Sequence, residues 1–112
     1  MDIIYSTKKL KKTLTYETKL VRKYGQQQAR AISARLYELD IVDTLAEIGP
    51  HPPARCHELT GNRAGQLSLD LRHPYRLIIE PANNPIPLKD DGGLDWNRVT
   101  KVRILGVEDT HG

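Results

Sequence analysis

The chain has 112 residues, of which 38% are hydrophobic and 28% charged, and its formal net charge is +3. This length predicts a single domain over residues 1–112, and the composition argues against disorder and against residence in a membrane. The single cysteine, Cys56, cannot form an internal disulfide, and no Cys or His pair has the spacing of a zinc site. With no apolar run typical of a signal peptide or a membrane span, we expect a soluble cytoplasmic protein.

The N-terminal part predicts a short strand followed by two helices. Residues 2–5 are β-prone, and Ser6 or Thr7 can cap the helix expected within residues 8–23, which Gly25 ends. The second helix ends near Asp40 or Ile41 and is followed by a brief helical turn. Helical spacing of apolar residues supports both helices: Leu10, Leu14 and Val21 in the first, and Ala29, Ile32, Leu36 and Leu39 in the second.

After residue 66 the period changes to that of a sheet. Residues 67–72 alternate, with Leu67, Leu69 and Leu71 on one face, and Gly61 and Gly65 shape the entry into this strand. The His73-Pro74 turn leads into a second strand at 75–80, so an antiparallel hairpin is the simplest pairing. Residues 81–98 are too polar for an element and predict a loop; residues 99–107 predict the last strand.

Four residues of the sheet region are candidates for RNA cleavage without a metal. His57 and His111 flank the strands, and an imidazole is the natural acid or base near pH 7. The guanidinium of Arg76, within a strand, suits the charge that develops on a phosphorane. Asp109 and His111 are two residues apart and point the same way in an extended chain, so the carboxylate can orient the imidazole. His51 and His73 are in loop and turn positions and are interpreted as structural.

Three segments resemble the HigB branch of the RelE/ParE superfamily of bacterial toxins: "QQQARAISARLYELDIVDT", "HELTGNRAGQLSLDLRHPYRLII" and the terminal "EDTH". The resemblance implies an α+β domain with two N-terminal helices packed on a small antiparallel sheet. It implies a ribosome-dependent endoribonuclease that cuts messenger RNA during translation with no cofactor, and its matching positions are His57, Arg76, Asp109 and His111. It also implies a helix-turn-helix antitoxin as partner.

Under this interpretation the basic residues acquire a role at RNA phosphates. Neutralised phosphates release condensed counterions, which makes such binding dependent on salt. The predicted contacts come from the first helix and from the segment around His57: Lys8, Lys9, Lys11, Lys12, Arg55 and Arg63.

Two departures from the family pattern leave alternatives open. Thr110 stands where relatives usually have a tyrosine that can stack on a base, and the loop 81–98, which contains Trp96, is longer than usual. That loop can cover the site, contact a partner or be tolerated surface. The alternative functions are inhibition of DNA gyrase in the manner of the ParE branch, and a catalytically degenerate protein that binds an antitoxin in operon repression.

Overall fold

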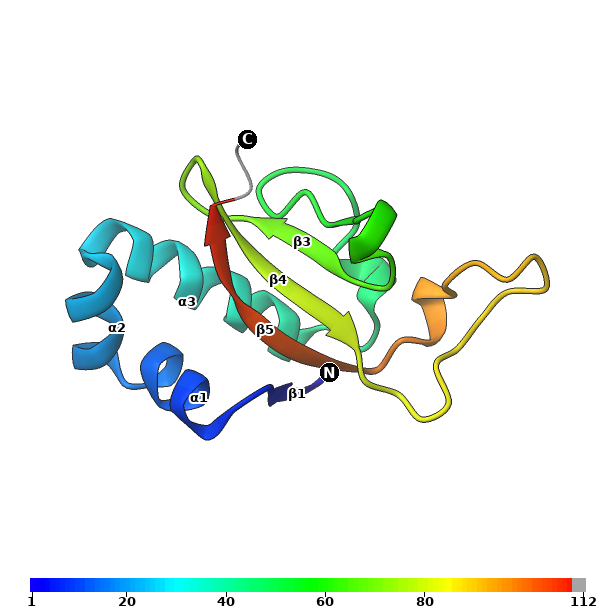
Figure 1. Ribbon diagram of the computed structural model, residues 1–112, viewed down its shortest axis with the longest axis horizontal. Helices are drawn as coiled ribbons and strands as arrows, with labels where there is room; N and C mark the ends of the chain where they lie inside the picture. The colour runs from blue at the N-terminus through cyan, green and yellow to red at the C-terminus, as the bar shows by residue number, and fades with distance from the viewer. Residues whose placement is uncertain (110–112) are drawn as a thin grey trace.

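The computed structural model describes residues 1–109, so the predictions for Thr110 and His111 lie outside the described residues. The predicted α+β class is confirmed (Figure 1). Its helices are α1 (Lys8–Thr15), α2 (Glu17–Tyr24) and α3 (Gln26–Ile41), with short 3-10 helices η1 (Leu45–Glu47), η2 (Gly61–Arg63) and η3 (Trp96–Arg98). Its strands are β1 (Asp2–Tyr5), β2 (His57–Glu58), β3 (Leu67–Asp70), β4 (Tyr75–Pro81) and β5 (Lys101–Asp109).

The sheet is mixed, so the prediction of a purely antiparallel sheet was not exact. Its strand order is β1-β5-β4-β3-β2, and the predicted antiparallel hairpin is the β3–β4 pair. The exception is β1, which pairs with β5 in parallel, with Asp2 opposite Lys101 and Tyr5 opposite Ile104. The N-terminal ammonium also donates to carbonyl groups at the end of α3, those of Leu39, Asp40 and Val42. The chain start is therefore tied to both layers of the fold.

The region predicted as one helix, 8–23, is two helices that meet at an extended Tyr16 (φ −94°, ψ 112°). Leu14 and Leu20 would lie about 120° apart around one continuous helix, and the break allows both to be buried. The hydroxyls of Thr13 and Thr15 also donate to carbonyls one turn back, a pattern that competes with regular helix and bends it. With α3, residues 1–109 contain three α-helices in place of the predicted two.

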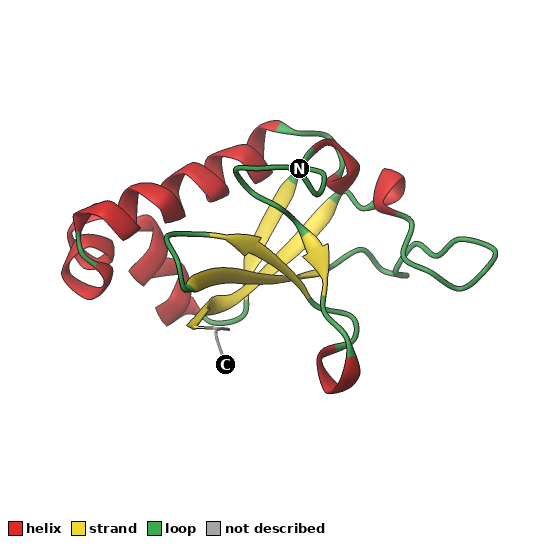
Figure 2. Ribbon diagram, turned by 90° about the horizontal axis from the view of Figure 1, so that it is seen from above, coloured by secondary structure: helices red, strands yellow, loops and turns green. Residues whose placement is uncertain are grey.

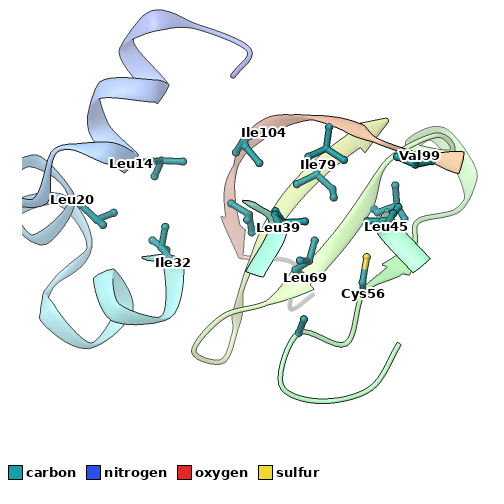
Figure 3. Close-up of a cluster of buried hydrophobic side chains, with 14 of the residues drawn as sticks. Leu14, Leu20, Ile32, Leu39, Leu45, Cys56, Leu69, Ile79, Val99 and Ile104 are labelled. Atoms are coloured by element: carbon teal, nitrogen blue, oxygen red, sulfur yellow. The ribbon is translucent and has the colours of Figure 1, made fainter. Parts of the chain in front are cut away.

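The core lies between α3 and one face of the sheet (Figure 2). Leu39 of α3 lies among residues of the sheet that include Leu69, Ile79 and Ile104, and all four are fully buried (Figure 3). The face predicted from the alternation in 67–72 and 75–80 therefore faces the helices. In Figure 1, α3 runs behind β3, β4 and β5, and the described α-helices leave the opposite face uncovered. We call this the open face, although Ser68 and Ile78 on it are fully buried.

The connection from β4 to β5 contains more structure than the sequence predicted. Leu88 and Leu94 form an isolated antiparallel bridge, closed by a turn in which Lys89 donates to the Gly93 carbonyl. The turn residues between them are polar, so the composition of the segment did not indicate this pairing. Near the end of the connection, Trp96 opens η3. Among residues 1–109, no helix is long and apolar enough to cross a membrane.

The buried thiol of Cys56 is expected to make the stability of the protein depend on pH. Burial, with a further contribution from Glu58, raises the pKa of its thiol from 9.0 to about 12. The unfolded thiol therefore ionises first, and the stability that the protonated thiol supports is complete below pH 9 and falls as the pH rises toward 12. We expect the unfolding free energy of the wild type, relative to Cys56→Ala, to decline by up to about 1.4 kcal/mol per pH unit above pH 9. Urea unfolding from pH 7 to 10 measures this, and a constant difference would contradict it.

Candidate active site on the open face of the sheet

The strand register gathers polar side chains on the face of the sheet that α3 does not cover. Residues directly opposite one another in paired strands share a face. On this face β2 and β3 align His57 with Ser68, and β3 and β4 align Asp70 with Arg76. Arg76 in turn lies opposite Glu108 on β5. The predicted residues His57 and Arg76, 19 positions apart in sequence, are therefore brought together.

His57 is held at both ring nitrogens. Its Nδ1 lies 3.0 Å from the backbone carbonyl of Arg55, and its Nε2 lies 3.2 Å from the hydroxyl of Ser68 and 3.4 Å from Nη1 of Arg76. A guanidinium only donates and a carbonyl only accepts, so we assign the proton to Nδ1 and the free electron pair to Nε2. The imidazole is thus in the form that can accept a proton on the open face.

The backbone at Arg55 is part of this arrangement. Its φ of 46° is the only left-handed value at a non-glycine position within residues 1–109. Such a conformation costs about 1–3 kcal/mol and persists where surrounding structure enforces it. Here it places the Arg55 carbonyl where it orients the His57 ring.

Asp70 lies between two arginines. Its carboxylate oxygens are 3.5 Å from Nε of Arg55 and 3.6 Å from Nε of Arg76, which is ion-pair range but long for hydrogen bonds. Consistent with this, Asp70 Oδ1 is buried and accepts no hydrogen bond from the described residues. The arginine side chains remain 59% and 31% exposed, respectively, so Asp70 positions them while their donor groups still face solvent.

Arg63 has a different partner from the one that the sequence predicted. Its two terminal nitrogens donate to both oxygens of Glu108 at 2.9 and 3.0 Å, and its Nε donates to Gln66. The hydrogen bond to Glu108 raises the pKa of the Arg63 guanidinium. This paired geometry ties η2 to β5, and RNA would have to compete with Glu108 for Arg63.

The C-terminal candidates lie at the end of β5. Asp109 pairs with Tyr75, and alternation along the strands places it on the face opposite to that of Arg76. Its neighbour Glu108 is the carboxylate that shares the face of Arg76. The structure therefore does not bring Asp109 next to His57, and His111 lies beyond the described part of the chain.

Three solved structures with the same architecture are a YoeB/ParE toxin and two structures that contain YoeB. The TM-score is 0.58 to a YoeB/ParE toxin from Agrobacterium tumefaciens, at 10% identity over 99% of this chain and 100% of that one. The TM-score is 0.55 to a YoeB–YefM complex, at 13% identity, and 0.54 to a YoeB dimer, at 15% identity, both from Staphylococcus aureus. Each of these matches covers 99% of this chain and 98% of the other. The chain has the YoeB/ParE fold. No family model and no curated protein matches the sequence.

On this YoeB/ParE fold the predicted RNA-binding residues fall into two separate groups. The four lysines of α1 are all exposed, on the helix that follows β1 at one edge of the sheet. Arg55 lies near the other edge, where it pairs with Asp70, and Arg63 reaches over the sheet to Glu108 of β5.

Three residues of the site were missed from the sequence: Ser68, Asp70 and Glu108. Ser68 and Asp70 alternate with buried leucines, and they lie opposite Ile78 and Arg76. The register of the hairpin alone would therefore have placed both residues on the face of Arg76. Glu108 required knowledge of the β4–β5 register, which shifts between Ile78 and Ile79. The bulge lies beside Gly106, and a glycine within a strand pattern is a sequence signal for a bulge that the prediction did not use.

Proposed function

We propose that this chain is the toxin of a toxin–antitoxin pair and that it cleaves messenger RNA in the translating ribosome without a metal. The observation that carries the proposal is the contact between His57 Nε2 and the Arg76 guanidinium on the open face of the sheet. The YoeB/ParE fold and the resemblance to the HigB branch support the toxin class. The exposed lysines of α1 are proposed to contact RNA phosphates.

In the proposed reaction His57 is the base. Its Nε2 takes the proton of a 2′-hydroxyl, and the 2′-oxygen attacks the adjacent phosphorus. Arg76 moves from its long contact with His57 onto the phosphate, where its paired donors stabilise the developing charge. The bond from phosphorus to the 5′-oxygen then breaks, which leaves a 2′,3′-cyclic phosphate, and an acid protonates the 5′-oxygen. His111, oriented by Asp109, is the proposed acid; this part rests on the resemblance alone, because the strand register places Asp109 on the face opposite to that of Arg76.

The proposed protein partner is an antitoxin. One neighbour of the same fold is described as a complex of YoeB with YefM. The HigB resemblance makes a helix-turn-helix antitoxin the specific proposal for this chain.

A ParE-like function is the second candidate, because the solved structures of this fold include a protein named YoeB/ParE. The fold alone does not separate the two activities. A gyrase inhibitor needs no base beside a guanidinium, so the His57–Arg76 contact favours RNA cleavage.

The discriminating experiment is brief induction of the intact chain without a partner, followed by mapping of transcript 5′ ends. New ends within translated codons that vanish when initiation is blocked are the expected result. Intact transcripts with blocked DNA supercoiling would favour the ParE-like function. Normal growth with intact transcripts would favour the degenerate alternative.

Arg76 allows a graded test of the same proposal. Loss of one preorganised donor of transition-state charge typically costs about 10²- to 10³-fold in rate. We expect Arg76→Ala to lower cleavage on programmed ribosomes by about 10²-fold and Arg76→Lys to restore only part of it, since an ammonium lacks the paired donors. Full activity of Arg76→Ala would remove this residue from the mechanism.

A further inference from the structure

The β4–β5 connection forms a cleft beside β2, at the edge of the sheet. Within β2, Glu58 lies opposite Leu67 on the face that packs against α3, whereas His57 shares the face of Ser68 and Arg76, so the cleft meets the candidate site at His57. The cleft has a volume of about 450 Å³, within the usual range for sites that bind small molecules. One wall comes from Cys56, His57 and Glu58 around β2, and the other from the segment of Leu94 to Asn97, which includes η3. His57 thus belongs both to the cleft and to the contact with Arg76.

The indole of Trp96 is fixed in this cleft. Its Nε1 donates to Glu58 Oε2 at 3.0 Å, which joins the connection to β2 across the cleft. Trp96 is partly buried because it packs against the core cluster, and the remainder of the residue is accessible to a ligand.

The segment that holds Trp96 is pinned by further contacts. Asp95 caps η3 by accepting from the Asn97 amide, and Arg98 donates to the Asp95 carboxylate at 2.8 Å and to the Leu88 carbonyl. The hydrogen bond from Arg98 lowers the pKa of Asp95. A wall that is already ordered loses little conformational entropy when a ligand binds.

The chemistry of the lining matches a nucleobase. An indole face stacks on any base, and single-stranded RNA is recognised mainly through such stacking combined with hydrogen bonds to base edges. The side chains of Asn97 and Asp95 supply amide and carboxylate groups, and Lys89 supplies a cation at the same cleft. The charged residues of the lining are Glu58, Asp95 and Lys89, so positive charge for a phosphate comes from the arginines beside His57.

We propose that this cleft binds one nucleobase of single-stranded RNA, stacked on Trp96, next to the phosphate that lies at His57 and Arg76. The proposal rests on the proposed function for its substrate and assigns base recognition to the β4–β5 connection.

Trp96 is the single tryptophan of the chain, so it reports directly on the cleft. The probe is a short single-stranded oligonucleotide with 2′-O-methyl riboses, which cannot be cleaved, together with the same oligonucleotide carrying one abasic position in turn. We expect saturable quenching of Trp96 fluorescence, and one abasic position that abolishes it. No quenching up to millimolar oligonucleotide would overturn the proposal, whether or not the protein cuts transcripts.

Variants separate stacking from simple packing. Stacking on an aromatic side chain is typically worth about 5- to 100-fold in affinity per base. We expect Trp96→Leu to weaken binding by that factor and Trp96→Phe by less, with the decisive abasic position adding no further loss to Trp96→Leu. Because these variants lack the tryptophan probe, their affinity is measured by the fluorescence anisotropy of a dye attached to the oligonucleotide, and the wild type is measured in the same way. Tyr37→Leu, which removes an aromatic ring that is 64% exposed on α3, is the matched control and should leave affinity unchanged.

The two proposals fail in different ways. If wild type cuts transcripts but Trp96→Leu and Trp96→Phe bind RNA as tightly as wild type, the base site is wrong and the ribonuclease stands. If base-dependent quenching occurs but no transcript is cut by wild type, the base site stands and the proposed cleavage is wrong.

Discussion

Replacement of His57 by alanine is expected to slow transcript cleavage by about 10²- to 10⁴-fold, the usual contribution of a positioned acid or base. The physical reason is that Nε2 is the acceptor on the open face, and alanine leaves no group there to take the proton of the 2′-hydroxyl. The measurement is the single-turnover rate on programmed ribosomes, with saturating protein so that the chemical step is observed.

His51→Ala is the matched control for that experiment. His51 is also an exposed histidine, but it precedes Pro52 in a loop and takes no side-chain part in the site. It should retain the wild-type rate. Equal rates for His57→Ala and wild type would show that the imidazole is not the base, and thermal unfolding of both variants would show whether either loss reflects folding.

Leu39→Ala is expected to destabilise the protein by about 2–5 kcal/mol. Leu39 is fully buried where α3 packs on the sheet, and alanine would leave a cavity lined by Ile79, Ile104 and their neighbours (Figure 3). Domains of this size are typically stable by about 5–15 kcal/mol, so the loss is a large fraction of the total. Urea unfolding with an unchanged m-value measures it.

Leu88→Ala serves as its control, because this leucine is 52% exposed on the β4–β5 connection. We expect a change within about 0.5 kcal/mol there. Leu39→Met, which nearly conserves volume, should cost less than about 1.5 kcal/mol. A loss below 1 kcal/mol in Leu39→Ala would mean that α3 and the sheet can close the cavity, contrary to the tight packing seen.

The elements that the sequence predicted best are those stabilised by local patterns. The helix around Ile32 and Leu39 was found because four apolar residues repeat at helical spacing, and it extends over Gln26–Ile41. The β3–β4 hairpin was found because alternation on both sides of a turn leaves few other pairings. The prediction of one continuous first helix was wrong. Only the packing of Leu14 and Leu20 shows why the helix breaks at Tyr16.

The candidate site was predictable only in part. His57 and Arg76 stand out as residue types suited to the chemistry, and the structure places them in contact. The residues that position these two side chains were not predicted from the sequence. They are Arg55, whose left-handed backbone orients the imidazole, and Asp70, which lies between two arginines. These depend on backbone conformation and on the pairing of three strands, and neither follows from residue type.

The sequence by itself therefore determined the α+β class, the central hairpin and the face of that hairpin that turns inward, because periodicity is a local property of the chain. The tertiary structure decided that β1 lies parallel to β5, that Glu108 holds Arg63, that Asp109 turns away from Arg76, and that Trp96 reaches Glu58. Each of these joins residues far apart in sequence, and such contacts form only where the whole set of packed strands and helices repays the entropy of closing the loops between them.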